Sequence, residues 1–136
     1  MFLLCRGVLV GTTPDGEMDV PEGPDEVAWF RFGPRPGEVG SAVIAGHFGW
    51  KNDIPAVFDY LHRLREGDKV VVIDEEGTTA TFVVRAVHVY GKDESAFDVF
   101  YSSDGKAHLN LVTCTGDWNV AKKTRPERLV VFTDLE

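Results

Sequence analysis

Residues 69–90 read KVVVIDEEGTTATFVVRAVHVY and contain the clearest local structure in the chain. Valine, isoleucine, threonine and phenylalanine dominate both halves of this stretch, and these residue types favour β-strands. Between the halves, Asp74 to Gly77 supplies the acidic residues and the glycine that are typical of a tight turn. The stretch therefore predicts a β-hairpin, with one strand over 69–74 and a longer strand over 78–90.

Further segments rich in β-branched and aromatic residues lie on both sides of this hairpin. Glycine, proline and aspartate separate them at short intervals, as at 14–16, 21–24, 33–37 and 104–105. Counting the hairpin, the predicted strands are 2–10, 27–32, 41–47, 69–74, 78–90, 107–114 and 127–133. Strands at such regular spacing predict a mainly β domain, either a closed barrel or a sandwich.

One helix is expected after the third strand. Proline suits the first position of a helix, and glycine commonly ends one. The helix would begin at Pro55 and end before Gly67, with an apolar stripe formed by Val57, Phe58, Leu61 and Leu64.

Length and charge limit the classes of function. A chain of 136 residues is long enough for one hydrophobic core, so we expect a single domain over 1–136, and nothing demands more than a monomer. The formal net charge of -8 disfavours nucleic acid as a partner, because phosphate binding requires a basic surface. The apolar opening 1–10 is interrupted by Arg6 and is too short to span a bilayer.

The two cysteines are too few for a disulfide framework and lack the paired spacing of a zinc site. Cys114 is the more informative, because it ends the predicted strand 107–114 and would lie at an accessible rim. Strand alternation places Asn110, Val112 and Cys114 on one face of that strand. The segment by itself is compatible with a reactive thiol or with a buried structural cysteine.

A catalytic thiol needs a neighbouring base or cation to hold it as the thiolate. His47 is the best-placed histidine, since it also ends a predicted strand and follows the small residues Ala45 and Gly46. Solvated or structural roles are expected for the other histidines, which are His62, His88 and His108.

Arg128 opens the last predicted strand, on the same face as Val130 and Phe132. It is either an edge residue in a surface salt bridge or a fixed cation for a developing oxyanion or an incoming peptide backbone. Trp50 and Trp118 lie in loops next to these candidates, and we expect them to line a peptide groove or to pack against the barrel mouth.

Three ordered segments together resemble the signatures of the bacterial sortases. They are Ala45-Gly46-His47, then Leu111-Val112-Thr113-Cys114, and then Arg128-Leu129-Val130-Val131. The resemblance runs from about Pro14 to the C-terminus and so covers nearly the whole chain. Segments 43–47, 55–58 and 66–68 look most like the class F and class D branches.

The resemblance implies a closed, eight-stranded sortase β-barrel with one or two short helices. It also implies a cysteine transpeptidase that needs no metal or cofactor and cuts a Leu-Pro-x-Thr-Gly sorting motif on surface proteins. In family terms Cys114 is the nucleophile, His47 the acid and base, and Arg128 the oxyanion or substrate clamp. Substrate-binding positions would be Trp50, Val112, Thr113 and Trp118.

The implied acceptor is an amine on a cell-wall precursor or a pilin, which would place the enzyme on the outer side of the membrane. Because the family pattern includes an earlier strand and an N-terminal membrane anchor, we expect this chain to lack both. Asn110 stands where a threonine commonly begins the cysteine signature, and Arg125 is a rival for the role of Arg128.

Two other functions stay open from the sequence. A thiol peptidase would cleave the peptide but transfer it only to water. A non-catalytic β-barrel would bind peptides through the surface around Trp50 and Trp118.

Overall fold

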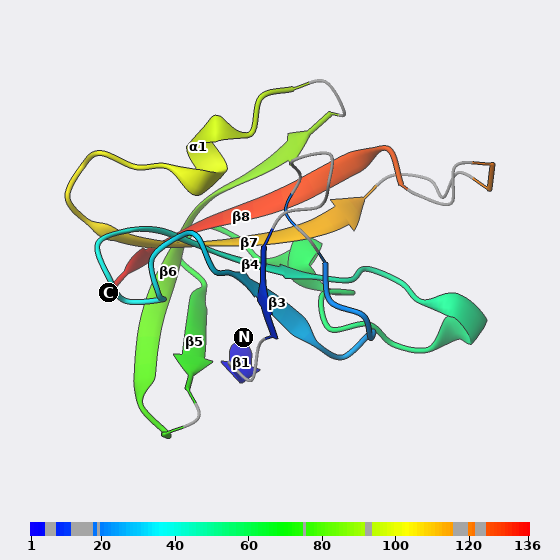
Figure 1. Ribbon diagram of the computed structural model, residues 1–136, viewed down its shortest axis with the longest axis horizontal. Helices are drawn as coiled ribbons and strands as arrows, with labels where there is room; N and C mark the ends of the chain where they lie inside the picture. Colours follow the sequence, from blue (N-terminus) through cyan, green and yellow to red (C-terminus); the bar gives the residue numbers. More distant parts are fainter. Residues whose placement is uncertain are drawn as a thin grey trace.

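A computed structural model of the chain describes all residues except 5–7, 12–17, 19, 75, 92–93, 116–119 and 122–124 (Figure 1). Its strands are β1 (Phe2–Leu4), β2 (Val8–Val10), β3 (Val27–Phe30), β4 (Gly40–Gly46), β5 (Lys69–Ile73), β6 (Thr79–Tyr90), β7 (Ala107–Thr115) and β8 (Glu127–Leu135). Its helices are the short α1 (Phe97–Phe100) and two 3-10 turns, η1 (Lys51–Asp53) and η2 (Leu61–Arg63). The mainly β prediction is confirmed, and in the described part of the chain no helix is both long enough and apolar enough to cross a membrane.

The strands form one eight-stranded sheet in the order β1-β5-β6-β8-β7-β4-β3-β2. The predicted hairpin is confirmed: β5 and β6 pair antiparallel, and the turn between them is closed by the amide of Gly77 on the carbonyl of Asp74, 3.1 Å apart. Gly77 has a φ of 81°, a conformation that glycine adopts without strain. The long strands β6, β8 and β7 form the centre of the sheet.

The predicted strand 2–10 is wrong as a single strand. Its first part, β1, pairs with β5 at one edge of the sheet, whereas β2 pairs with β3 at the other edge. The four residue steps from Leu4 to Val8 can span about 14 Å at most. The two edges must therefore approach each other, which gives the sheet its curled, barrel-like form.

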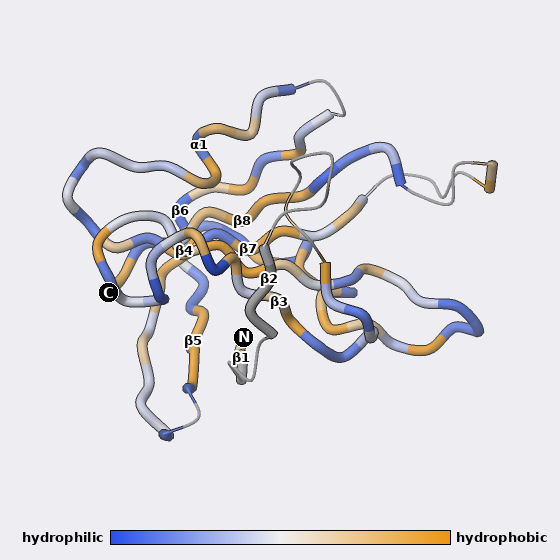
Figure 2. Tube along the Cα trace, in the orientation of Figure 1, coloured by the Kyte–Doolittle hydropathy of each residue, from blue (hydrophilic) through white to orange (hydrophobic). Residues whose placement is uncertain are grey.

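The sheet buries apolar side chains on both faces. The main core face is built around Phe58 and Phe82 and includes the alternating pairs Ala42 and Ile44, Leu109 and Leu111, and Leu129 and Val131. The opposite face, called the α1 face, carries Val43, Tyr90, Val99, Val130 and Phe132, with Val112 packed against them. Figure 2 shows hydrophobic residues concentrated along the central strands, while several of the connecting loops are hydrophilic.

The predicted helix over 55–66 is wrong. Backbone donors in this segment bond instead to acceptors that are distant in the sequence. The amide of Val57 donates to the carbonyl of Pro24 at 2.7 Å, and the amide of Phe58 donates to the carbonyl of His47 at 3.0 Å. The Asp59 carboxylate further accepts the amides of Gly49 and Ala56. Only short turns remain, ending in η2. The apolar pattern still predicted burial correctly, since Phe58 and Leu61 are fully buried.

Gly46, the last residue of β4, has no room for a side chain. A Cβ there would lie 2.7 Å from both Phe58 Cδ2 and Val57 Cγ1, and Phe58 is fully buried. We expect Gly46→Ala to lower the free energy of unfolding by about 1–3 kcal/mol, the usual cost of overpacking a core. Denaturant unfolding would measure this. Gly91→Ala is the matched control, because a Cβ at Gly91 meets nothing within 4 Å, and an equal loss in both variants would contradict the packing argument.

The carboxylate of Asp104 anchors the segment that leads into β7. It accepts the amide of Lys106, the hydroxyl of Ser102 and the Nε2 of His108, at 2.9, 3.0 and 2.7 Å. The Lys106 amide lowers the pKa of Asp104 most strongly; desolvation opposes it, and with the further help of His108 and Ser102 the pKa falls from its usual 3.8 to about 2. The carboxylate therefore stabilises the fold above pH 3.8, and this contribution is lost as the pH falls from 3.8 to about 2.

We expect Asp104→Asn to be less stable than the parent protein near neutral pH. The difference in stability between the two proteins should become smaller as the pH falls from 3.8 to about 2. Thermal unfolding at a series of pH values would measure it. Asp25→Asn, at an exposed position before β3, serves as the control. A gap that is the same at every pH would contradict the assigned role of the Asp104 charge.

Candidate active site

Two of the three predicted catalytic residues lie opposite each other in the sheet. Cys114 on β7 is the register partner of Arg128 on β8. Directly opposed residues in an antiparallel pair place their Cβ atoms about 4.5–5.5 Å apart on the same face. Val112 and Val130, two residues further along the same strands, pack together on the α1 face. Cys114 and Arg128 therefore share that face.

His47 lies at the end of the strand on the other side of β7. The last register pair of the parallel strands β4 and β7 joins Ala45 to Val112. The strands stay together one residue further, because the Thr113 hydroxyl donates to the carbonyl of Gly46 at 2.8 Å. Continued by one more residue, this register brings His47 beside Cys114. Since neighbouring strands are about 4.8 Å apart, we infer that the backbones of His47, Cys114 and Arg128 lie in one row across three strands.

Tyr90 extends this row, although no local sequence pattern pointed to it. It is the register partner of Arg128 on β6 and is only 9% exposed. Burial raises the pKa of the Tyr90 hydroxyl, and the charges of Asp98 and Glu94 raise it further. The hydroxyl therefore stays protonated near neutral pH and can donate a hydrogen bond.

The half-buried ring of His47 is held from two sides. Its Nε2 lies 2.5 Å from the carbonyl oxygen of Pro21. A carbonyl can only accept, so Nε2 carries a proton and Nδ1 is the nitrogen left to exchange one. Trp50 packs edge-on against the ring with centroids 5.0 Å apart. Trp50 thus lies beside the predicted catalytic histidine, where it helps to fix the ring.

The side chain of Arg128 is exposed and is oriented by the chain just before it. Its Nη1 donates to the carbonyls of Arg125 and Glu127, both at 3.0 Å. A guanidinium has five N–H donors, so others are left for a substrate. The rival Arg125 is used differently, since its guanidinium lies over the ring of Phe48 at 4.8 Å.

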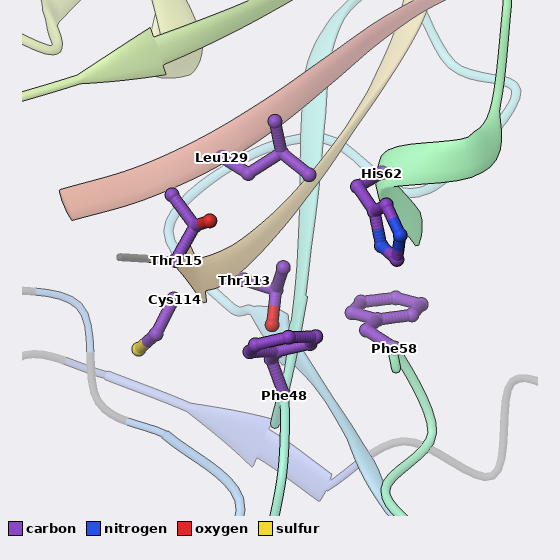
Figure 3. A pocket seen from close by; sticks show the side chains of 7 residues that line it. All are labelled: Phe48, Phe58, His62, Thr113, Cys114, Thr115 and Leu129. Atoms are coloured by element: carbon purple, nitrogen blue, oxygen red, sulfur yellow. The ribbon is translucent and has the colours of Figure 1, made fainter. Parts of the chain in front are cut away.

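A pocket of about 190 Å³ opens beside Cys114 at the end of β7. Figure 3 shows the residues that line it, which are Phe48, Phe58, His62, Thr113, Cys114, Thr115 and Leu129. The ring of Phe48 lies between Cys114 and the pair of Phe58 and His62, and the sulfur of Cys114 points away from that pair. Cys114 is only partly exposed, at the rim between this pocket and the α1 face.

Five residues of this pocket were not predicted to belong to the site, namely Phe48, Phe58, His62, Thr115 and Leu129. Two of them, Phe48 and His62, could have been suspected. Phe48 directly follows His47, and an aromatic residue next to a candidate base was the available signal. His62 was expected in a solvated or structural role on a helix. It is exposed, but it lines the pocket and its ring meets Phe48 edge-on at 6.2 Å.

The predicted substrate-binding residues are placed differently from one another. Val112 is partly buried on the α1 face, two residues before Cys114 on β7. Thr113 is 3% exposed, lies on the opposite face and lines the pocket. Trp118 lies outside the described residues. Within the described part of the chain, no group of three or more His, Cys, Asp or Glu side chains is arranged to hold a metal ion.

The fold and the row define a class: a curled, mainly β domain that presents a thiol at a strand end, between a histidine and an arginine. The chain matches the family model of the sortase domain over residues 7–136, and it belongs to the sortase family. A comparison with curated proteins gives no significant match.

Solved structures with the same fold include sortases of three classes. Sortase A from Corynebacterium diphtheriae is 25% identical, with a TM-score of 0.66 over 81% of this chain and 47% of that one. Sortase C-1 from Actinomyces oris is 24% identical, with a TM-score of 0.65 over 81% of this chain and 58% of that one. A Clostridium perfringens sortase D5 transpeptidase is 23% identical, with a TM-score of 0.62 over 82% of this chain and 62% of that one. The chain thus spans about half to three-fifths of the length of these sortases.

Proposed function

We propose that this chain is the catalytic domain of a sortase that cleaves a Leu-Pro-x-Thr-Gly-type motif and transfers the acyl fragment to an amine. The observation that carries the proposal is the strand register that pairs Cys114 with Arg128 and, continued past Ala45 and Val112, places His47 beside Cys114. Cys114 is the nucleophile, His47 moves the protons and Arg128 binds the oxyanion or the substrate backbone. The match to the sortase domain supports the same assignment.

The reaction has two steps that balance in protons. The Cys114 thiol gives its proton to His47, its sulfur attacks the threonine carbonyl, the bond to glycine breaks, and His47 passes the proton to the departing amine. An acceptor amine then attacks the resulting thioester, His47 takes a proton from that amine, and the cysteine leaves as the thiolate, which the proton on His47 restores to the starting state. A thioester retains enough acyl-transfer energy for an amine to replace water as the final nucleophile.

Arg128 contributes by charge. In both steps the carbonyl oxygen becomes negative, and a fixed donor placed before the reaction lowers the energy of that state. Because Nη1 is held by two backbone carbonyls, the guanidinium is oriented in advance and loses little freedom when the substrate binds.

The proposed donors are surface proteins that carry the sorting motif, and the proposed acceptor amine belongs to a cell-wall precursor or a pilin. The enzyme would act as a monomer on the outer side of the membrane. Segments 43–47, 55–58 and 66–68 support a place near the class F and class D sortases. Cleavage of a panel of motif variants, compared with enzymes of the known classes, would test that placement.

Intact-mass spectrometry of the protein with a Leu-Pro-x-Thr-Gly peptide tests the reaction itself. We expect an acyl adduct on Cys114 that hydroxylamine releases as the hydroxamate. Cleavage that gives only the free acid, even with a strong amine present, would indicate a peptidase instead. Binding without adduct or cleavage would indicate a non-catalytic peptide-binding barrel.

A further inference from the structure

A second and larger hollow lies on the α1 face, away from the pocket at Cys114. It has a volume of about 800 Å³ and is lined by β6, by the ends of β7 and β8, and by the segment 94–106 that carries α1. Figure 1 shows α1 on the connection between β6 and β7. We call this hollow the acidic groove, because four carboxylates line it: Glu94, Asp98, Asp104 and Asp134.

Most charges in the acidic groove already have a partner. Glu94 pairs with His88 at 2.9 Å, and both Asp104 and Asp134 lie 2.7 Å from His108. Asp134 also bonds to Arg85. The side chains of Asp98 and Lys106, which both line the groove, make no hydrogen bond or ion pair with any residue in the described part of the chain. Asp98 therefore brings to the groove a carboxylate that has no paired cation among the described residues.

A buried acceptor at the floor of the groove points to a ligand as well. Asn110 is 1% exposed, and its Nδ2 donates to the carbonyl of Val99 in α1 at 2.7 Å. That bond fixes the amide orientation, so Nδ2 is satisfied and Oδ1 is the polar atom of this groove-lining residue that is left to be satisfied. Among the described residues, no donor lies within hydrogen-bonding distance of Oδ1. A buried acceptor without a partner costs free energy, so this position favours a ligand that brings an N–H.

The acidic groove begins at the catalytic row. Tyr90 lines it and is the register partner of Arg128, which in turn lies opposite Cys114. Asn110 precedes Cys114 by four residues on the same face of β7, a distance of about 13 Å along the strand. His108, at the far end, is about 20 Å away by the same rise per residue. An extended peptide reacting at Cys114 would cover that distance with four to six residues.

From this geometry we propose that the acidic groove binds a cationic group, an ammonium or guanidinium, carried four to six residues away from the reacting bond by one of the two substrates. The cation pairs with Asp98 and donates to Asn110 Oδ1. This inference rests on the proposed transpeptidase function and adds a selectivity to it. The cation comes either from residues that flank the sorting motif or from the acceptor.

Two kinetic arms distinguish these sources. The donor arm measures the rate of thioester formation for motif peptides that differ only in one flanking residue, which is Lys or Gln. This residue stands at the fifth or sixth position from the scissile bond, either before or after the motif. In the acceptor arm, the thioester is made from a neutral peptide, and its aminolysis is compared for glycine peptides with Lys or Gln five residues from the amine. We expect one arm to favour Lys by about threefold to tenfold, as for one partly exposed charge pair with a charge-assisted bond.

Asp98→Asn should abolish the preference for Lys, measured within the variant as the ratio of its rates on the Lys and Gln substrates. Glu66→Gln, which removes an exposed carboxylate outside the groove lining, is the matched control and should keep the preference. High salt should also weaken the preference, because it screens the charge pair. Equal rates for Lys and Gln in both arms, or a preference that survives Asp98→Asn, would overturn the proposal.

A binding measurement separates this proposal from the proposed function. Titration calorimetry of Cys114→Ala with the same Lys and Gln peptides needs no catalysis. If no peptide forms a thioester on the parent protein, the transpeptidase function fails. The groove is then judged by whether the Lys peptides bind more tightly than the Gln peptides, and whether Asp98→Asn removes the difference. Equal binding would overturn the groove as a cation site.

Discussion

Replacing Cys114 by alanine should abolish both cleavage of a sorting-motif peptide and formation of an acyl adduct. The thiol supplies the atom to which the acyl group is bonded, and no other side chain in the row can form a thioester. The other cysteine, Cys5, lies outside the described residues, so the adduct must be mapped to Cys114 by peptide mass analysis. Product formation followed by chromatography measures the loss, which we expect to reach the limit of detection.

Folding must be excluded as the cause of that loss. Cys114 is only partly exposed and carries no structural disulfide in the described part of the chain, so alanine removes a small side chain at a rim. The variant should unfold at nearly the same temperature as the parent protein and should still bind the peptide. Substantial residual cleavage by a folded Cys114→Ala protein would remove the thiol from the mechanism and contradict the proposed thioester.

The strands were predictable because their signals are local. Alternating β-branched residues and the turn residues between them identified seven segments, and six of these correspond to single strands of the sheet within one or two residues of the predicted ends. The same alternation placed Cys114 with Val112, and Arg128 with Val130, on one face.

The two predicted elements that were wrong depend on partners that are distant in the sequence. The stretch 2–10 has the composition of one strand, but its two ends pair with strands at opposite edges of the sheet. The stretch 55–66 has a helical apolar pattern, but Pro24 and His47 take its amide donors. Periodicity records which side chains are buried, and it does not record which acceptor each backbone donor meets.

The candidate site shows the same division. Each of His47, Cys114 and Arg128 was found by its place at a strand end next to small or apolar residues. Their common row depends on the register of three strands, which no local pattern encodes. Tyr90 and the acidic groove were missed for this reason, because β6 and the segment 94–106 reach the α1 face only through tertiary pairing.

Arg128→Ala should slow thioester formation by about a hundredfold or more, the usual effect of removing an oxyanion donor. The loss should fall mainly on kcat if the guanidinium meets the charge that develops in the transition state, and on KM if it only holds the substrate backbone. Steady-state cleavage rates, together with the rate of adduct formation, separate these two cases. Because the Arg128 side chain is exposed, the variant should keep the stability of the parent protein.

Two further variants test whether the effect of Arg128 on the rate depends on its position or on its charge alone. Arg128→Lys keeps the charge but loses the planar fork that the carbonyls of Arg125 and Glu127 orient, so it should restore only part of the rate. Arg125→Ala removes the guanidinium that lies over Phe48 and should have a smaller effect than Arg128→Ala. An unchanged rate in Arg128→Ala would remove this residue from the mechanism. The protonated hydroxyl of Tyr90, its register partner, would then be the next donor in the row to test.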